Sequence, residues 1–461
     1  MSATARRRSS LLLALAALCA LCATISAFTS TAQAIPAFAR KYNLNCQACH
    51  TAPPVLNQYG QRFLENGYQL PGTEDGGIVG KRTLGDLTLD DVGHYLGFRM
   101  VGNVARNWRF AQQNPPGTDT GVVENKTEFT FPENFVLFTG GAVAKNIGYM
   151  VELGHDTEGG GASVERGFLT FNNLGGHDLA HLRVGRFDPN TFSSYATVRQ
   201  QLSDVGESAS SSCPPFTPCR LNRPALGPAA FAAKFYGLYD RTGTAISPHA
   251  ASLYNSGGEM GIDIHGRPFG DWFLYQVGVL NGAQEGFGDT NKGKDFYGMI
   301  RFDYARAHDL SANISGFYYH GNSNAKVASQ EDVQWNRMGV SARLTYRMVD
   351  LYAAYAYDRI HKIPTGLVNL FDRTATGLTV GLDTFVTDHT LLSFRYDHMD
   401  AGGLIDTRQS TRFVGLQAKH FLRSNIAVYA RNDVNLRSAE GGDQAARNLR
   451  NAFFTGIDVV F

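Results

Sequence analysis

The chain has 461 residues, in which 42 Lys and Arg stand against 41 Asp and Glu, and 18% of the residues are charged. This nearly even balance excludes the strongly basic surface of a nucleic-acid-binding protein. It gives no reason to expect an acidic surface as a partner either, and we expect no nucleic acid among the partners.

The first 34 residues have the three parts of a secretory signal peptide. Arg6 to Arg8 precede an apolar run from Leu11 to Ala23, and Ala32-Gln33-Ala34 forms a cleavage site. The run is too short to span a bilayer, which takes about 20 apolar residues. We therefore predict a signal peptide over 1–34 and an exported chain that begins at Ile35.

Cys46-Gln47-Ala48-Cys49-His50 has the C-x-x-C-H pattern through which a c-type haem is attached. Two thiols at this spacing lie on one face of a helical turn, where each can add to one vinyl group of a haem. A zinc ribbon would need a second close Cys pair, and a thioredoxin-like site would need a βαβ context. The motif predicts one covalent haem c held by Cys46 and Cys49, with His50 as an axial ligand of the iron.

Residues 35–92 are predicted to form a small α-helical monohaem cytochrome module. Pro53-Pro54 fits a helix start, Gly67 fits the stop, and apolar residues recur at helical spacing between them, a stripe that also suits an ordinary core face. Chains below about 40–70 residues rarely build a sufficient core. We therefore expect another part of the chain to cover the second face of the haem.

The sixth ligand of the haem iron is left open by the sequence. The usual ligand of a small cytochrome c is a downstream Met, but the first Met after His50 is Met100, inside the first predicted strand. The remaining possibilities are His94, a His of the larger domain, the α-amino group of Ile35, or no ligand. A turn-forming linker, residues 71–77, follows the helical stripe.

Residues 93–461 are predicted to form an outer-membrane β-barrel. Segments of about ten residues alternate between an apolar and a polar face, as in Ile147 to Leu153 and Met338 to Leu344. Short connections such as 144–146 and 423–425 alternate with longer polar ones such as 361–372 and 437–449, which is typical of transmembrane barrels. The expected strands number about sixteen: 94–104, 133–143, 147–156, 162–172, 179–187, 257–265, 272–281, 294–304, 310–320, 335–346, 349–359, 374–386, 388–399, 411–421, 424–434 and 450–461.

The fold class is thus an all-β transmembrane barrel of about sixteen antiparallel strands with a small N-terminal helical module.

The longest connection, from Asp188 to about Gly257, contains Cys213 and Cys219, for which we predict a loop disulfide in an oxidising compartment. The alternation places a set of charged residues in the lumen, where paired and solvated charges are the simplest explanation. They are Arg99, Glu152, Asp263, Arg301, Asp303, Arg337, Arg343, Arg395, Asp397, Lys419, Arg431, Asp433 and Asp458. The alternative is that some of them hold haem propionates or guide an ion.

The motif together with its flanks resembles a family of outer-membrane monohaem cytochrome–porin fusions of iron-oxidising bacteria. The resemblance covers residues 36–68: Pro36 to Arg40, Cys46 to His50, Pro54 to Phe63, and Gly67-Tyr68. Gln61 stands between Gly60 and Arg62, where the family pattern has Arg directly after Gly. The barrel matches the family in architecture only.

The resemblance implies an electron conduit that passes electrons from extracellular Fe(II), or another donor, through one haem to a periplasmic cytochrome or other carrier. It implies an outer-membrane location among lipid, with the cytochrome module in the periplasm or in the barrel lumen. Two alternatives stay open. Electrons could flow outward to an extracellular acceptor, or the chain could be a porin with a cytochrome plug or sensor. The sequence does not decide whether such a protein is an enzyme. It also does not show which residues would be catalytic.

Overall fold

The structure is a computed structural model that describes most of the chain from residue 37 onward. The described residues are 37–53, 55–70, 82–84, 87–89, 95–113, 119–129, 131–132, 134–156, 162–187, 259–281, 293–306, 310–324, 332–362, 374–401, 409–436 and 449–460. The predicted signal peptide 1–34, His94, the linker 71–77 and the Cys213/Cys219 pair lie outside them.

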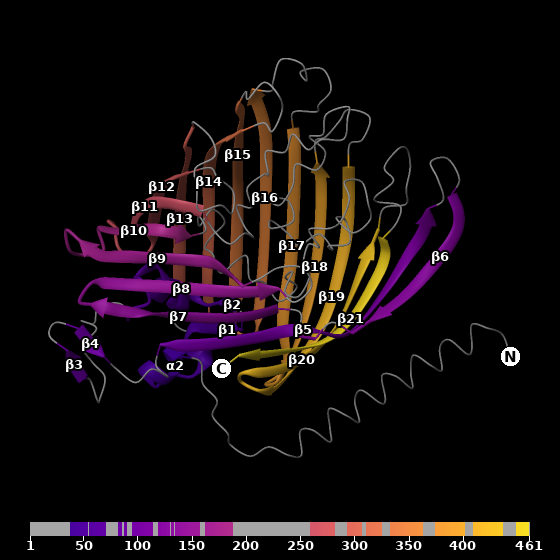
Figure 1. Ribbon diagram of the computed structural model, residues 1–461, viewed down its shortest axis with the longest axis horizontal. Helices are drawn as coiled ribbons and strands as arrows, with labels where there is room; N and C mark the ends of the chain where they lie inside the picture. The colour runs from indigo at the N-terminus through magenta and orange to yellow at the C-terminus, as the bar shows by residue number, and fades with distance from the viewer. Residues whose placement is uncertain are drawn as a thin grey trace.

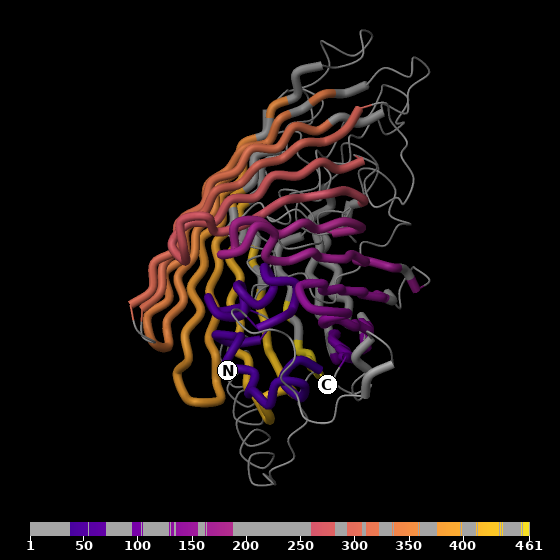
Figure 2. The backbone as a smooth tube through the Cα atoms, turned by 90° about the vertical axis from the view of Figure 1, so that its left-hand side faces the viewer, coloured from indigo at the N-terminus to yellow at the C-terminus, as the bar shows by residue number. Residues whose placement is uncertain are grey.

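The described strands from β5 onward pair side by side, all antiparallel, and close into one barrel, as Figures 1 and 2 show. Their bounds are β5 Leu96–Gln113, β6 Asp119–Glu128, β7 Asn134–Ala144, β8 Ile147–Asp156, β9 Ser163–Leu174, β10 Ala180–Phe187, β11 Glu259–Gly266, β12 Phe273–Leu280, β13 Asp295–Arg306, β14 Leu310–Asn324, β15 Asp332–Tyr346, β16 Val349–Lys362, β17 Thr374–Thr387, β18 Thr390–Ala401, β19 Gln409–Arg423, β20 Ile426–Asn435 and β21 Leu449–Val460. A separate hairpin joins β3 Arg82–Leu84 to β4 Leu87–Leu89.

β6 and β7 together count as one strand of the barrel wall. β5 pairs with β7 over its first residues and with β6 further along, and both partners run antiparallel to it. With these two segments counted once, the barrel has sixteen strands, as predicted. The sequence prediction missed β6 and ended β5 too early. All sixteen predicted strands have a counterpart whose bounds differ mostly by a few residues.

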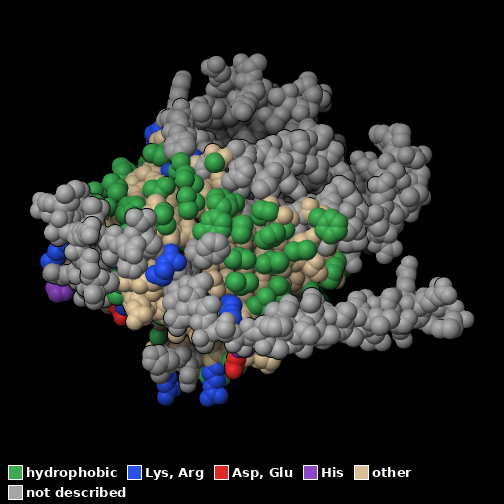
Figure 3. Space-filling model, turned by 60° about the horizontal axis from the view of Figure 1, so that its bottom comes forward, with side chains coloured by type: hydrophobic (Ala, Val, Ile, Leu, Met, Phe, Trp, Pro, Cys, Tyr) green, Lys and Arg blue, Asp and Glu red, His purple; other side chains and the backbone are tan. Residues whose placement is uncertain are grey.

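The wall has an apolar outer face and a polar inner face, because successive side chains in a strand point to opposite sides. Ile314 and Val340 on adjacent strands are each 56% exposed, and Figure 3 shows hydrophobic side chains over the outside of the barrel. Arg301 and Arg337 are 0% exposed. An apolar exterior around a polar interior is the pattern of an outer-membrane β-barrel with a porin-like fold. Among the helices that the structure describes, none is long and apolar enough to cross a membrane.

Tight turns join alternate strands at one end of the barrel. Residues 145–146, 347–348, 388–389 and 424–425 make two-residue turns, and the predicted short connections 144–146 and 423–425 contain two of them. Longer turns, 175–179 and 267–272, join β9 to β10 and β11 to β12. We call this end, defined by these six turns, the short-turn end.

The N-terminal segment 37–70 packs against the inner wall at the short-turn end, and we call it the plug. It contains helices α2 Ala37–Tyr42, α3 Cys46–Cys49 and α4 Gln58–Glu65, and the paired strands β1 His50–Ala52 and β2 Val55–Leu56. Its contacts include Asp178 and Asp271, which are residues of the turns after β9 and β11. The plug is drawn in indigo in Figures 1 and 2.

The predicted start of the plug helix at Pro53-Pro54 is wrong. Val55 and Leu56 form β2, and the pairing of Leu56 with His50 turns the chain back before α4 begins. Asn57 caps α4 instead, because its side-chain oxygen accepts a hydrogen bond from the Gly60 amide at 2.9 Å. The predicted stop is confirmed: α4 ends at Glu65, and Gly67 follows in the left-handed region with φ +62°.

Candidate functional site

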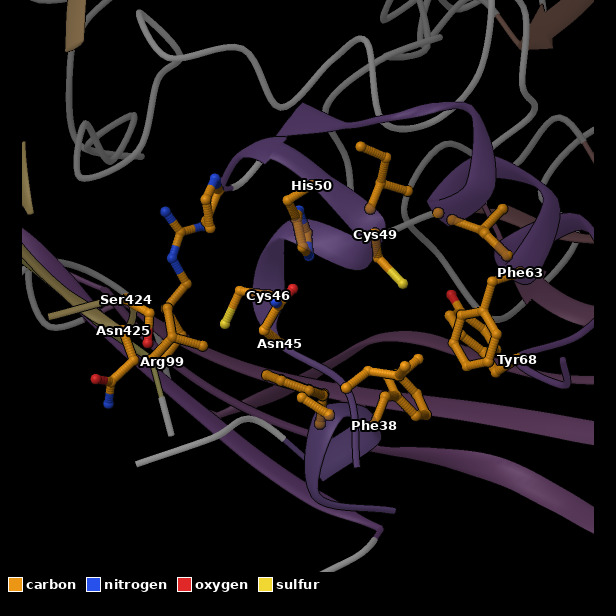
Figure 4. A pocket seen from close by; sticks show the side chains of 18 of the residues that line it. Phe38, Asn45, Cys46, Cys49, His50, Phe63, Tyr68, Arg99, Ser424 and Asn425 are labelled. Carbon is orange, nitrogen blue, oxygen red and sulfur yellow. The ribbon is translucent and has the colours of Figure 1, made fainter. Parts of the chain in front are cut away.

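Helix α3 presents both cysteine thiols to one cavity. Asn45 caps this single turn, and its side-chain oxygen accepts a hydrogen bond from the Ala48 amide at 2.9 Å. Figure 4 shows Cys46, Cys49 and His50 around the same space, and all three line the cavity. Both thiols are free. The structure thus brings together the three residues that the motif singled out.

Asn57 and Gly60 fix helix α4 against helix α3. The Asn57 side-chain amide donates to the carbonyl oxygens of Gln47 at 3.1 Å and Ala48 at 2.9 Å. A Cβ on Gly60 would lie 2.1 Å from the Cys49 carbonyl oxygen, so only glycine permits this approach. The backbone of the C-x-x-C-H turn is therefore held by residues that follow it closely in the sequence.

The cavity has a volume of about 240 Å³, and its wall comes from both the plug and the barrel. Apolar side chains of the plug make most of one part, with Phe63 and Tyr68 on the Cys49 side in Figure 4. The barrel part of the wall comes from strands at both ends of the sequence. It consists of Arg99, Phe138, Met150, Glu152, Arg166, Lys419, Phe421, Ser424, Asn425, Ile426, Ala427, Asp458 and Val460.

Four aromatic rings hold the apolar part together. The Phe38 and Tyr68 rings stack with their centroids 5.2 Å apart and their planes 9° from parallel. Phe63 meets Phe38 edge-on at 5.2 Å and Tyr42 at 5.6 Å. Such pairs stabilise a core beyond the area they bury, by about 0.5–1.5 kcal/mol each. They give one side of the cavity a rigid, water-excluding surface.

The other side of the cavity is polar, and its cations outnumber the carboxylates that line it, although Arg166 also pairs with Glu165 at 3.6 Å. Arg99 makes two hydrogen bonds of 3.0 Å to the Asp458 carboxylate, and Lys419 donates to the same carboxylate at 3.0 Å. Arg166 donates to Glu152 at 2.5 Å. Three cations thus face two carboxylates among the lining residues. This side suits a ligand that carries acidic groups.

Asn425 adds an unused hydrogen-bond donor to that polar side. Its side chain is 6% exposed and lines the cavity, and its Nδ2 has no hydrogen-bond partner among the described residues. Figure 4 shows Asn425 beside Ser424 and Arg99, on the Cys46 side. Buried polar atoms are nearly always hydrogen-bonded in native proteins. A buried donor at the cavity edge therefore fits a bound group with an acceptor there.

The two thiols are held in their protonated form. Burial raises the pKa of Cys46, which also interacts with Ser424 through a side-chain hydrogen bond. Burial, followed by the charge of Cys46, raises the pKa of Cys49 to about 11. Thiolates are the reactive form toward disulfides and metal ions. Raised pKa values are the opposite of what a redox-active or metal-binding dithiol shows, because such sites stabilise the thiolate.

A buried ionic cluster fastens the far end of α4 to the barrel. Glu65 accepts hydrogen bonds from Arg301 at 2.7 Å and from Arg267 at 2.9 Å, and its backbone oxygen lies 2.8 Å from Nε2 of His265. Burial by itself would raise the pKa of Glu65, but the charges of Arg267 and Arg301 lower it from 4.5 to about 2. The carboxylate therefore stays charged, and it holds the plug to strands far away in the sequence.

Two glycines let the plug backbone touch the wall directly. A Cβ on Gly148 of β8 would lie 2.2 Å from the Gly67 carbonyl oxygen, and a Cβ on Gly67 would lie 2.0 Å from Oγ1 of Thr170. The stacking of Tyr68 on Phe168, at 6.4 Å between ring centroids, continues this contact. The side of the plug that follows α4 is therefore seated closely on β8 and β9.

The charged residues predicted to face the lumen do so wherever their side chains are described. The side chains of Asp397 and Asp433 lie outside the described part of the structure. Several of the others form pairs, as expected for a charged lumen: Arg183 with Asp263, Arg301 with Asp303 at 2.9 Å, and Arg343 with Asp350 at 2.5 Å. Within the described part of the chain, no group of three or more His, Cys, Asp or Glu is arranged to hold a metal ion.

Sequence reasoning did not identify Asn57, Gly60, Met150, Glu65 and Asn425 as site residues. Asn57 and Gly60 lie in the quoted motif region, where an Asn before a helix is a recognisable cap signal. Met150 and Asn425 carried no signal, because only the closed barrel brings them to the plug.

Closure, the sixteen antiparallel strands and the apolar exterior define the class as a porin-like outer-membrane β-barrel. Three solved structures are similar to this chain over most of its length. An anion-selective porin from Comamonas acidovorans has 14% identity and a TM-score of 0.48, covering 79% of this chain and 98% of its own. OmpF of Salmonella typhi, in complex with daunomycin, has 13% identity and a TM-score of 0.45, covering 82% and 98%. A loop-deletion mutant of OmpT of Vibrio cholerae has 12% identity and a TM-score of 0.44, covering 79% and 98%.

No protein-family profile matches the sequence. No curated protein matches it significantly either.

Proposed function

We propose that this chain is an outer-membrane electron-transfer protein with one haem c attached through Cys46 and Cys49, and with His50 as an axial ligand of the iron. The observation that carries this proposal is the shared cavity. Two free, half-buried thiols and an imidazole face one space that is apolar on one side and carries charged donors on the other. A haem has the same division, with an apolar macrocycle and two acidic propionates.

The residues of the cavity would bind the haem and adjust its reduction potential. The thiols form the covalent attachment, the aromatic cluster excludes water, and Arg99, Lys419 and Asn425 offer donors to acidic groups. When bound, the haem supplies a one-electron carrier, whose potential depends on its ligands and its burial. The barrel half of the wall covers what the plug alone is too small to enclose.

We further propose that the electrons come from extracellular Fe(II) and leave to a periplasmic cytochrome or other carrier. The resemblance of residues 36–68 to the cytochrome–porin fusions supports Fe(II) as the donor. Short turns face the periplasm in outer-membrane barrels, and the plug contacts the turns at this end. The periplasmic carrier would therefore approach from the plug side, and the donor would approach from the side of the long connections.

Vesicles that contain the holoprotein with its long connections outward test this proposal. External Fe(II) is expected to reduce the haem and then a trapped internal acceptor. His50→Ala is expected to abolish both reductions while heat-modifiable migration in gels shows that the barrel still assembles. An oxidised, covalently bound haem that stays unreduced by Fe(II) for minutes at mildly acidic to neutral pH would contradict the Fe(II) assignment. The same vesicles, loaded with an internal reductant and an external acceptor, measure outward flow.

A porin with a fixed plug is the second candidate, and the buried Glu65 cluster favours it. Two guanidinium groups and a histidine hold α4 to the wall, and such buried contacts would keep the plug in place with or without a cofactor. Solute flux separates the candidates. A plain porin passes small sugars or ions in liposome swelling with or without haem, whereas the electron-transfer protein turns over electrons with its lumen closed to solutes.

A further inference from the structure

Among the described residues that line the cavity, one side chain of the barrel suits an iron ligand on the side opposite His50. Of the described residues that line it, His50 is the only histidine, and His94 lies outside the described residues. His181 and His265, two described histidines of the lumen, contact Asn172, Asp263 and Glu65 instead, away from the thiols. Among the residues that the structure describes, a ligand on the other side would come from a lining side chain other than histidine.

Met150 is the one methionine in the lining. It lies on β8 and is 8% exposed, and its backbone pairs directly with Gly140 of β7. Paired residues of antiparallel strands send their side chains to the same face. Because Gly140 has no side chain, the space beside Met150 on the inner face stays open to the plug.

The sulfur of Met150 lies next to the aromatic ring that faces His50 across the cavity. A Cβ placed on Gly140 would be 3.0 Å from Cζ of Phe38 and 3.1 Å from Sδ of Met150, so both atoms border the space that Gly140 leaves open. Figure 4 shows Phe38 on the opposite side of the cavity from His50. Sδ of Met150 and the His50 imidazole therefore belong to opposite walls.

Two other possible ligand groups of the lining, the Lys419 amine and the Tyr42 hydroxyl, are already engaged. Nζ of Lys419 donates to Asp458 at 3.0 Å and to the Pro53 carbonyl oxygen at 3.3 Å. The Tyr42 hydroxyl donates to the Tyr68 carbonyl oxygen at 3.4 Å, and the Tyr68 ring is stacked on Phe38. A thioether has no proton to lose and is a soft ligand suited to haem iron.

We propose that Met150 of the barrel wall is the sixth ligand of the haem iron. This inference rests on the proposed function. It assigns His50 to the plug side of the iron and a thioether to the barrel side. Axial methionine raises the reduction potential of a c-type haem. The barrel would then set the potential as well as enclose the cofactor.

The test compares full-length holoproteins that carry Met150→Leu, Met150→His or the control Met299→Leu. Leu keeps the volume of Met and is tolerated in most cores. Met299 lies on β13, is 3% exposed and does not line the cavity. Each sample is assayed for covalent haem by acid–organic extraction, for the far-red charge-transfer band of thioether-ligated ferric haem, and for its reduction potential.

The wild type and Met299→Leu are expected to show the band, and Met150→Leu is expected to lose it while the haem stays attached. At the wild-type midpoint potential, the ratio of reduced to oxidised haem should fall about tenfold in Met150→Leu. Met150→His should stay low-spin, lack the band and also have a lower potential. A wild type without the band but with covalent haem, or a band that survives Met150→Leu, overturns this proposal alone. Haem that extracts fully from the wild type overturns the proposed function with it.

Discussion

The Glu65 carboxylate and the Arg301 guanidinium lie 236 positions apart in the chain and form an ion pair of 2.7 Å. Arg301 is wholly buried, and Glu65 is almost so. The pair joins the end of the plug helix to the middle of the barrel wall. Its partner Arg267 lies in the turn after β11 and binds both Glu65 and Asp303 at 2.9 Å.

Glu65→Gln is expected to loosen the plug without unfolding the barrel. Removing one partner of a buried ion pair costs about 3–5 kcal/mol, because the remaining charges lose their compensation. Hydrogen exchange of the α4 amides should report that loss as faster local opening, and bilayer recordings should show more frequent open events. Asp271→Asn is the matched control, since its pair with Arg62 at 2.6 Å is 73% exposed on the Asp271 side. That pair should contribute at most about 1 kcal/mol. Equal effects of the two substitutions would mean that Glu65 does not fasten the plug.

The fastening should weaken in acid. The pKa of Glu65 is lowered from 4.5 to about 2 in the docked plug. A carboxyl group with a depressed pKa stabilises the folded state fully above its ordinary pKa, and this stabilisation disappears as the pH falls toward the depressed value. Exchange of the α4 amides, corrected for its intrinsic pH dependence, should be constant above pH 4.5 and should accelerate between pH 4.5 and 2. Glu65→Gln should lack this acceleration. An identical acid response in that variant would assign it to another group.

Haem attachment should depend on both cysteines of the α3 turn. Two thioether bonds resist acid–organic extraction, so the wild-type haem is expected to stay with the protein. The double variant Cys46→Ala, Cys49→Ala should assemble the barrel and contain no covalent haem. Each single variant should keep one thioether. The absorption band of its reduced haem should lie at longer wavelength than in the wild type, because one vinyl group stays unsaturated. Complete loss of haem from the wild type under extraction would refute the assignment of the motif.

Gly60→Ala should disturb the turn that holds the cysteines. The new Cβ would lie 2.1 Å from the Cys49 carbonyl oxygen, a backbone atom that cannot rotate away. Overpacking of this kind costs about 1–3 kcal/mol, so we expect less covalent haem per barrel and a lower melting temperature of the haem absorbance. Gly316→Ala in β14 is the control, because the nearest atom beyond its chain neighbours, the Gly339 carbonyl oxygen, would be 3.8 Å from the new Cβ. Unchanged haem content in Gly60→Ala would show that α3 and α4 can separate without harm.

The barrel was predictable because its signal is local. Alternation along β8, from Ile147 to Asp156, needs only a two-residue period and a turn at Lys145-Asn146 to be recognised. β6 does not stand out in the sequence, because its apolar and polar residues do not alternate regularly. Its backbone nevertheless pairs with β5 and continues the wall. The start of α4 was misplaced because a Pro pair outweighed the Asn57 cap, and Val55 and Leu56 were assigned to the wrong element.

Half of the candidate site was predictable, and half was not, for one physical reason. Cys46, Cys49 and His50 are neighbours in the sequence, and their spacing already implies shared chemistry. The polar wall opposite them depends on contacts such as Arg99 with Asp458, which are 359 positions apart. Alternation places such residues in the lumen but does not say at what height or angle around the barrel they meet.

The seam between β5 and β21 makes the cavity a product of barrel assembly. Apart from this seam and the pairing of β5 with β7, each described pairing of barrel strands joins two strands that are consecutive in the sequence. This one seam converts an open sheet into a ring, and it also brings Asp458 to Arg99. An unclosed intermediate lacks that wall, so a cofactor already attached to α3 would be exposed until the ring shuts. For a chain that already carries its cofactor, completion of the site would therefore depend on when the barrel inserts into the membrane and on what protects the chain until then.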